Sequence, residues 1–196
     1  MEKAKIQVFA GSTRNDSLHR RLVQVAAAQL RRVGADVTVA DLRDYPMPLY
    51  DGDLEAAQGM PAGAKALKDL VRGQDALVIA SPEYNGSFSA LLKNAIDWIS
   101  RPEPGEPRLA AFQGKTAALL SGSPGPGGGQ RGLRHLRELL EMIGVKVVPS
   151  QLTVARTMQA FDTEGRLARR EDEEALERVI GELLEAVQKQ PRLAAA

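Results

Sequence analysis

Five short apolar runs alternate along the chain with longer segments in which apolar residues recur at helical spacing. The apolar runs cover residues 5–10, 37–40, 76–80, 116–120 and 145–148. The amphipathic segments cover residues 18–33, 62–71, 89–99, 130–143 and 171–188. The runs predict strands and the amphipathic segments predict helices. The run at 76–80, Ala-Leu-Val-Ile-Ala, is continuously apolar, as expected for a strand that is covered on both faces.

Strict alternation of strand and helix predicts an α/β fold with a parallel sheet and helices on both faces. Five strands favour a flavodoxin-like, doubly wound sheet of order 2-1-3-4-5 over a six-stranded dinucleotide-binding fold. The chain has 196 residues, without an internal repeat or a dividing linker, so we expect a single domain over residues 1–190. We expect residues 191–196 to form a disordered tail.

Composition narrows the function classes. Apolar residues make up 43% and charged residues 26% of the chain, which is ordinary for a globular protein. The net charge of +1 provides no field that would favour nucleic acid or an anionic membrane as a partner. There is no cysteine, which excludes disulfides, thiolate nucleophiles and cysteine-bound metal. His19 and His135 lie in no metal-binding spacing, so we expect no metal site. The sequence shows neither a leader nor a membrane-spanning run, and we expect a cytoplasmic protein.

The loop after the first strand, Gly11-Ser12-Thr13-Arg14-Asn15-Asp16-Ser17, has the residue types that bind a phosphate. Its hydroxyls and Arg14 can donate hydrogen bonds, and Ser17 stands where the N-cap of the next helix belongs. A capped turn with a solvated arginine is an equal alternative from this loop alone. Because only Gly11 is present, the loop lacks the three glycines that bring a dinucleotide pyrophosphate close to the backbone, which favours a mononucleotide.

The loop after the third strand, Ser81-Pro82-Glu83-Tyr84-Asn85-Gly86, offers an aromatic wall and hydrogen-bond donors, as a flavin ring requires. A proline-initiated turn with a half-buried tyrosine is the alternative. We interpret Glu83 as an exposed or helix-capping carboxylate rather than as a catalytic acid. The glycine-rich loop at residues 121–129 follows the fourth strand, and we interpret it as a ligand-contacting loop rather than a linker. We expect Trp98 to pack in the core or against a second subunit.

Three blocks of the sequence resemble the NADPH-dependent FMN reductase family, and within it the bacterial quinone and chromate reductases. They are Gly11–Ser17, Pro82-Glu83-Tyr84-Asn85 and Leu92-Lys93-Asn94-Ala95-Ile96-Asp97-Trp98. The resemblance covers nearly the whole chain. It implies a flavodoxin-like fold that binds FMN without a covalent bond, usually as a homodimer or homotetramer.

By position, the resemblance assigns the FMN phosphate to the first loop and the isoalloxazine ring to the other two. The expected cofactor-binding residues are Ser12, Arg14, Asn15, Ser17, His19, Pro82, Glu83, Tyr84, Asn85, Gly86, Ser121, Gly122 and Ser123. His19 stands where the family often has an asparagine, and as a phosphate donor we expect it to be protonated. Gly86 replaces a bulkier residue, which widens the pocket. Ser89 replaces a proline, so we expect a less rigid helix start, and the loop at 101–108 is slightly long for the family.

The resemblance implies that NAD(P)H gives a hydride to flavin N5 and that a small-molecule acceptor then takes its place, which predicts ping-pong kinetics. The expected acceptors are quinones, free flavin, azo dyes and metal oxyanions such as chromate. FMN itself carries the hydride, so no catalytic side chain is required. The alternatives are a flavodoxin-type electron carrier, which the net charge of +1 disfavours because flavodoxins are acidic, and a non-catalytic FMN-binding or regulatory protein.

Overall fold

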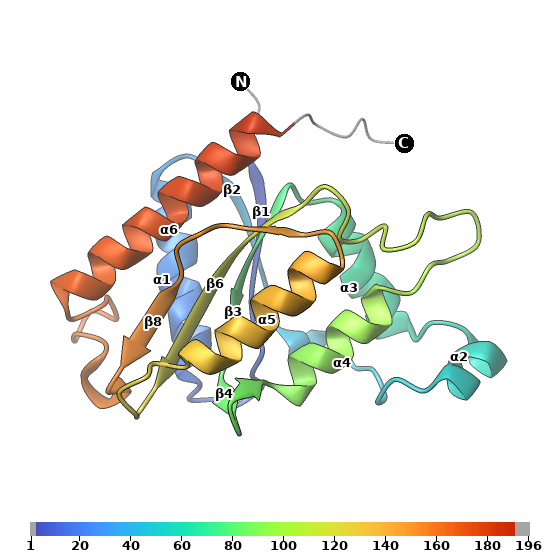
Figure 1. Ribbon diagram of the computed structural model, residues 1–196, viewed down its shortest axis with the longest axis horizontal. Coiled ribbons are helices and arrows are strands. Elements are labelled where there is room, and N and C mark those ends of the chain that lie inside the picture. The colour runs from blue at the N-terminus through green and yellow to red at the C-terminus, as the bar shows by residue number, and fades with distance from the viewer. Residues whose placement is uncertain (1–2, 191–196) are drawn as a thin grey trace.

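A parallel sheet forms the centre of the computed structural model, which describes residues 3–190 (Figure 1). The tail predicted at 191–196 lies outside the described residues. The sheet contains β1 (Lys5–Ala10), β2 (Asp36–Ala40), β3 (Ala76–Ala80), β6 (Thr116–Ser123), β7 (Lys146–Val147) and β8 (Leu152–Ala155). The strand order is β2-β1-β3-β6-β7, with β8 also paired to β6, and every pairing is parallel. This confirms the predicted fold class and order.

The edge of the sheet beyond β6 differs from the prediction. β7 pairs with the first residues of β6, and β8 pairs with its last four, from Leu120 opposite Leu152 to Ser123 opposite Ala155. The second pairing extends β6 into residues that we expected to be loop. Arg137 satisfies the carbonyls of the irregular segment between β7 and β8, since its Nη2 donates to Val148 O at 2.8 Å.

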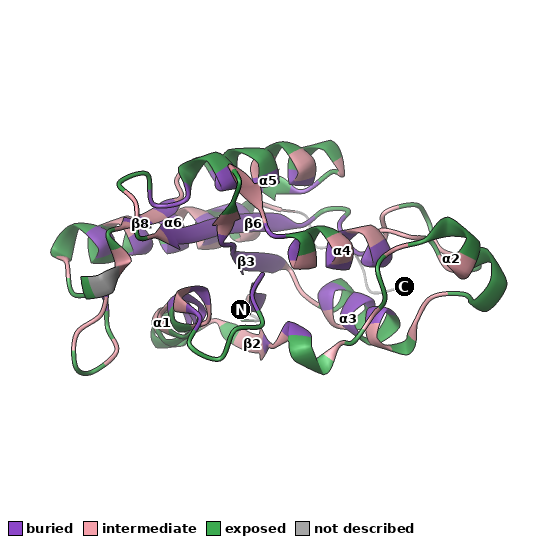
Figure 2. Ribbon diagram, turned by 90° about the horizontal axis from the view of Figure 1, so that it is seen from below, coloured by how far each residue is buried: buried purple, intermediate pink, exposed green. Residues whose placement is uncertain are grey.

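Five long helices cover the two faces of the sheet. They are α1 (Leu18–Arg32), α3 (Ala62–Arg72), α4 (Ala90–Ile99), α5 (Gln130–Met142) and α6 (Arg170–Lys189). Side chains alternate along a strand, so Ile6 and Val8 of β1 pack with α1 and α6, whereas Phe9 packs with α3, α4 and α5 on the other face. Figure 2 shows the buried strands and the exposed outer faces of the helices.

The three predicted ligand loops lie side by side because β1, β3 and β6 are neighbours in the sheet and run in the same direction. Gly11 N donates to Ala80 O at 2.8 Å, and Ser81 N donates to Leu120 O at 2.9 Å, so each loop leaves the sheet next to the following one. The order of the strands therefore creates one site from three distant segments.

The segment between β2 and α3 contains two short helices where we expected a loop: η1 (Leu42–Asp44) and α2 (Gly52–Gln58). None of the α2 residues is buried, and the helix projects from the body (Figure 1). Its base is fixed by α4, because Trp98 Nε1 and Asn94 Nδ2 both donate to Pro48 O at 2.8 Å. Trp98 is fully buried and meets Tyr50 edge-to-face, with the ring centroids 5.1 Å apart, which confirms the predicted packing role.

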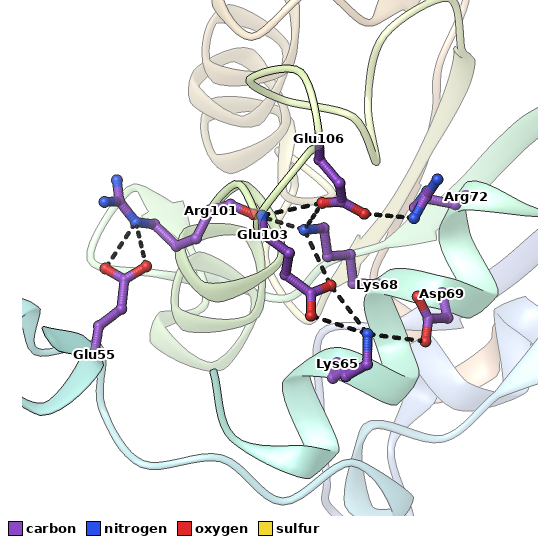
Figure 3. A network of polar contacts seen from close by, with 8 residues as sticks. All are labelled: Glu55, Lys65, Lys68, Asp69, Arg72, Arg101, Glu103 and Glu106. Atoms are coloured by element: carbon purple, nitrogen blue, oxygen red, sulfur yellow. Dashed lines mark hydrogen bonds and ion pairs between the residues drawn. The ribbon is translucent and has the colours of Figure 1, made fainter. Parts of the chain in front are cut away.

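A network of charged residues anchors the proline-rich loop at 101–108 to α3 (Figure 3). Lys68 is completely buried, and its Nζ donates to Arg101 O at 2.8 Å and to the Glu106 carboxylate. The hydrogen bond from Lys68 lowers the pKa of Glu106, and the one from Lys65 lowers the pKa of Glu103. This loop leads into the first residue of β6, so the network lies at the edge of the sheet opposite the ligand loops.

Candidate functional site

The three loops surround a cleft of about 410 Å³ at the carboxyl edge of the sheet. Its lining residues are Ser12, Arg14, Asp16, Ser17, Leu18, His19, Arg21, Pro82, Glu83, Tyr84, Gly122, Ser123, Pro124 and Thr157. Most of the predicted cofactor-binding residues are therefore brought together in one place. A cleft of this size between loops of an open α/β sheet is a typical binding site for a small molecule.

The first loop forms one end of the cleft and presents hydrogen-bond donors there. Ser17 is the N-cap of α1 and accepts a hydrogen bond from Arg20 N at 3.4 Å, while Ser12 Oγ accepts from Arg14 N at the same distance. No acidic residue occupies the first turn of α1, so the positive end of its dipole is not neutralised from within the helix. Hydroxyls, an arginine and an open helix N-terminus are the donor set that a phosphate requires.

The two acidic or amide neighbours of Arg14 differ from the sequence-based expectation. Asp16 was not among the expected cofactor-binding residues, whereas Asn15 was. Asp16 lines the cleft, and its carboxylate pairs with Arg14 Nη2 at 3.4 Å. Asn15 is not among the residues that line the cleft, and its Oδ1 accepts a hydrogen bond from Arg43 Nη1 at 2.8 Å. Arg43 also pairs with Asp41, and this hydrogen bond lowers the pKa of Asp41. Asn15 thus joins the first loop to Arg43 and, through it, to Asp41.

His19 connects the first loop to the third. Its ring is buried, and its Nε2 accepts a hydrogen bond from Gly122 N at 3.2 Å. Burial lowers the pKa of His19 from 6.5 to about 4. The imidazole is therefore neutral at pH 7 and carries its proton on Nδ1. The expectation of a protonated His19 is wrong, because desolvation outweighs the other effects on the ring. A neutral His19 can still donate through Nδ1.

The second loop is a β-hairpin, which the sequence analysis did not predict. β4 (Glu83–Tyr84) pairs antiparallel with β5 (Ser87–Phe88). Asn85 and Gly86 have φ angles of 51° and 77°, as in a type I′ turn, for which the Asn-Gly pair was an available signal. The turn carries both residues beyond the lining of the cleft, whereas Pro82, Glu83 and Tyr84 remain in it. Tyr84 is 54% exposed, so it can serve as a wall for a ligand.

Glu83 joins the hairpin to the start of α5. Its Oε2 accepts a hydrogen bond from Gly132 N at 2.9 Å, so the carboxylate caps the helix, as interpreted from the sequence. The two segments approach closely because Gly132 has no side chain: a Cβ at this position would lie 3.2 Å from the backbone of Ser87. The conformation of the ring side of the cleft is thereby coupled to the position of α5.

Only part of the glycine-rich loop borders the cleft. Gly122, Ser123 and Pro124 line it, whereas Ser121 is fully buried behind them and donates through Oγ to Ser81 O at 2.7 Å. A Cβ on Gly122 would lie 2.3 Å from Leu18 Cδ2, so a larger residue here would displace the Leu18 side chain of α1. Ser121 therefore supports the cleft from behind, and the three residues that follow it form the surface.

The N-terminus of α4, the helix that follows the hairpin, is capped by a side chain. Ser89 is the N-cap of α4, where its Oγ accepts from Leu92 N at 3.2 Å and donates to Gly11 O at 2.7 Å. Two hydrogen bonds thus anchor this helix start, and its lower rigidity relative to a start with proline stays a prediction.

Sequence reasoning missed Arg21, Leu18, Pro124 and Thr157 in addition to Asp16. Arg21 lies one turn after Ser17 on α1, so the helical period could have placed it on the same side. Thr157 follows β8, a strand whose short alternation was not recognised. Among residues 3–190 there is no cluster of three or more potential metal ligands. Within the same range, no helix is long and apolar enough to cross a membrane.

Comparisons with known proteins agree with this geometry. The family model for NADPH-dependent FMN reductases matches residues 4–159. An NAD(P)H-dependent FMN reductase of Pseudomonas aeruginosa is 37% identical over 185 residues, which cover 94% of this chain and 93% of the relative. A quinone reductase of Escherichia coli is 37% identical over 151 residues, or 75% of this chain and 74% of the relative. The solved structure of FerB, a flavoenzyme NAD(P)H:(acceptor) oxidoreductase from Paracoccus denitrificans, superimposes with a TM-score of 0.79 at 26% identity, covering 95% of this chain and 98% of FerB.

Proposed function

The chain belongs to the NADPH-dependent FMN reductase family, and from this premise we propose that it passes electrons from NAD(P)H through bound FMN to quinones and related small acceptors. The observation that carries the proposal is the composition of the cleft. The Ser17-capped start of α1, without an acid in its first turn, opens into the same cleft as Tyr84 and Gly122. One end of this cleft suits a phosphate, and the other suits an aromatic ring.

In this proposal the phosphate of FMN lies against Ser12, Arg14 and Ser17. Arg14 then exchanges its pairing with Asp16 for the phosphate, because a charge-assisted hydrogen bond to a dianion is the stronger one. The neutral His19 keeps Gly122 in place and offers Nδ1–H to the same ligand.

The isoalloxazine ring lies between the hairpin segment and the third loop, against Pro82, Glu83, Tyr84, Gly122 and Ser123. When bound, FMN supplies the chemistry by accepting a hydride at N5 and releasing its electrons to an acceptor. Backbone groups of the second and third loops would hold the edge of the ring, and the exposed Tyr84 would lie beside it.

A single cleft accommodates the electron donor and the acceptor in turn, which supports ping-pong kinetics with quinones, free flavin, azo dyes or metal oxyanions such as chromate. A small-molecule acceptor, rather than a nucleic acid or a membrane, agrees with the net charge of +1. We also propose a homodimer or homotetramer, in which the exposed α2 projection is available for subunit contact.

The experiment that tests this function is an absorbance spectrum of the purified protein followed by NADPH addition without oxygen. We expect a yellow protein that bleaches, and whose colour returns when a quinone is added. A protein that binds FMN but is not bleached by NADPH or NADH supports the electron-carrier alternative. A protein that takes up no FMN contradicts the proposal.

A further inference from the structure

Four charged side chains line the cleft, and three of them have partners. Glu83 accepts a hydrogen bond from Gly132 N, and Arg14 pairs with Asp16. In the part of the chain that the structure describes, the fourth, Arg21, makes neither an ion pair nor a side-chain hydrogen bond. An exposed arginine without a carboxylate partner in a ligand cleft is available to bind an anion.

The position of the Arg21 cation is nevertheless defined. Its guanidinium carbon lies 4.0 Å from the centroid of the Phe161 ring. Phe161 belongs to a segment that folds back on itself, with an antiparallel bridge from Phe161 to Leu167 and a hydrogen bond from Ala168 N to Ala160 O at 3.0 Å. Contact with an aromatic ring uses the face of the guanidinium and leaves the N–H groups at its edge free for an oxyanion. Arg21 is therefore prepositioned without being neutralised.

Arg21 lies apart from the groups assigned to FMN. It follows Ser17 by one helical turn, about 6 Å along the axis of α1. Arg21 lines the cleft together with Pro124 and Thr157, and the proposed FMN site assigns no role to any of these three residues.

We propose that Arg21, supported by Phe161, binds a phosphate group of the dinucleotide reductant. This inference rests on the proposed function, since it concerns the second ligand of the same cleft. NADPH carries a diphosphate and a 2′-phosphate, and a protein with a net charge of +1 attracts them only through local cations. Arg21 contacts no reacting atom in this arrangement, so it acts on the binding of the reductant and not on hydride transfer.

The test compares Arg21→Ala, Arg21→Lys and Phe161→Leu with the wild-type holoenzyme. Arg32→Ala is the matched control, because Arg32 lies at the other end of α1 and, among residues 3–190, its one ion pair is with Glu177, at 3.9 Å. We expect Arg21→Ala to raise the KM for the reductant about tenfold or more while kcat changes less than twofold. Arg21→Lys and Phe161→Leu should give smaller increases, and the control should give none.

Direct binding of adenosine 2′,5′-bisphosphate to the holoenzyme, measured by calorimetry, gives a readout that is independent of turnover. Weaker binding of this probe and a higher KM for NADPH alone assign Arg21 to the 2′-phosphate. Equal increases in KM for NADPH and NADH assign it to the diphosphate.

Unchanged KM and probe affinity in Arg21→Ala overturn the inference, as does a loss of FMN affinity with no effect on either dinucleotide. A wild-type flavin that NADPH and NADH fail to bleach contradicts the proposed function instead, and binding of the bisphosphate then decides the role of Arg21.

Discussion

His19 Nε2 and Gly122 N are joined by a hydrogen bond of 3.2 Å between residues 103 positions apart in the sequence. This bond connects the start of α1, next to the Gly11–Ser17 loop, to the end of β6, where Gly122 lines the same cleft. It also fixes the tautomer of the imidazole, because Nε2 must remain an acceptor. Two parts of one ligand site are thus held together by a side chain that must stay neutral.

The stability of the flavin-free protein should depend on pH through His19. Its pKa is about 4 in the fold against 6.5 for the free side chain, so between these values the unfolded chain binds more protons. The free energy of unfolding should therefore fall as the pH drops from 6.5 through 4, by about 3 kcal/mol in total from this group. Urea unfolding at several pH values, followed by the fluorescence of Trp98, measures the effect.

The matched variants for this prediction are His19→Gln and His135→Gln. Since His135 is exposed, its replacement should preserve the pH dependence, whereas His19→Gln should remove this part of it. Identical pH dependence in the wild type and His19→Gln would contradict the prediction.

Replacing Arg14 by alanine should weaken FMN binding by roughly 1–3 kcal/mol, the range for a hydrogen bond to a charged group. Titration of the apoprotein with FMN, followed by flavin fluorescence, measures this loss. Arg178→Ala, an exposed arginine on α6, serves as the control and should bind FMN normally. Full flavin affinity in Arg14→Ala would exclude Arg14 from the phosphate site.

Glu83 should act through the hydrogen bond to Gly132 N rather than as an acid. Glu83→Gln retains an oxygen acceptor, so FMN affinity and the pH profile of kcat should stay close to those of the wild type. Glu83→Ala leaves the amide of Gly132 without its partner, and we expect it to weaken FMN binding about tenfold, the effect of one such hydrogen bond. If Glu83→Gln lost turnover as severely as Glu83→Ala, the carboxyl group would have a chemical role.

Replacing Gln7 by an apolar residue of similar size should increase the free energy of unfolding. It lies on β1, fully buried, and neither atom of its amide group has a hydrogen-bond partner among the described residues. Burying an amide without partners costs about 1–3 kcal/mol, so Gln7→Met should raise the free energy of unfolding by about 1–2 kcal/mol. Urea denaturation checks the change. A destabilised Gln7→Met variant would show that the amide is hydrogen-bonded inside the protein.

The order β2-β1-β3-β6-β7 and the three loops that border the cleft could be predicted from the sequence, whereas the pairing of β8 with β6 could not. The continuous apolar run at Ala76–Ala80 marked a central strand, and strand–helix alternation restricted the connections, since both signals are local and periodic. The Gly11–Ser17 loop could be predicted to border a ligand site because its polar residues are consecutive in the chain. Asn85 and Gly86 carried a hairpin signal of this local kind that went unused.

Which side chains of these loops line the cleft depends on the packing of the folded chain. Asn15 is not among the lining residues and hydrogen-bonds to Arg43, whereas Arg21 is among them and contacts Phe161, a residue 140 positions later in the chain. Likewise, the tautomer of His19 depends on where Gly122 arrives. The packing of helices against the sheet sets these contacts. It brings together segments that are far apart in the chain, and no local pattern in either segment predicts that they meet.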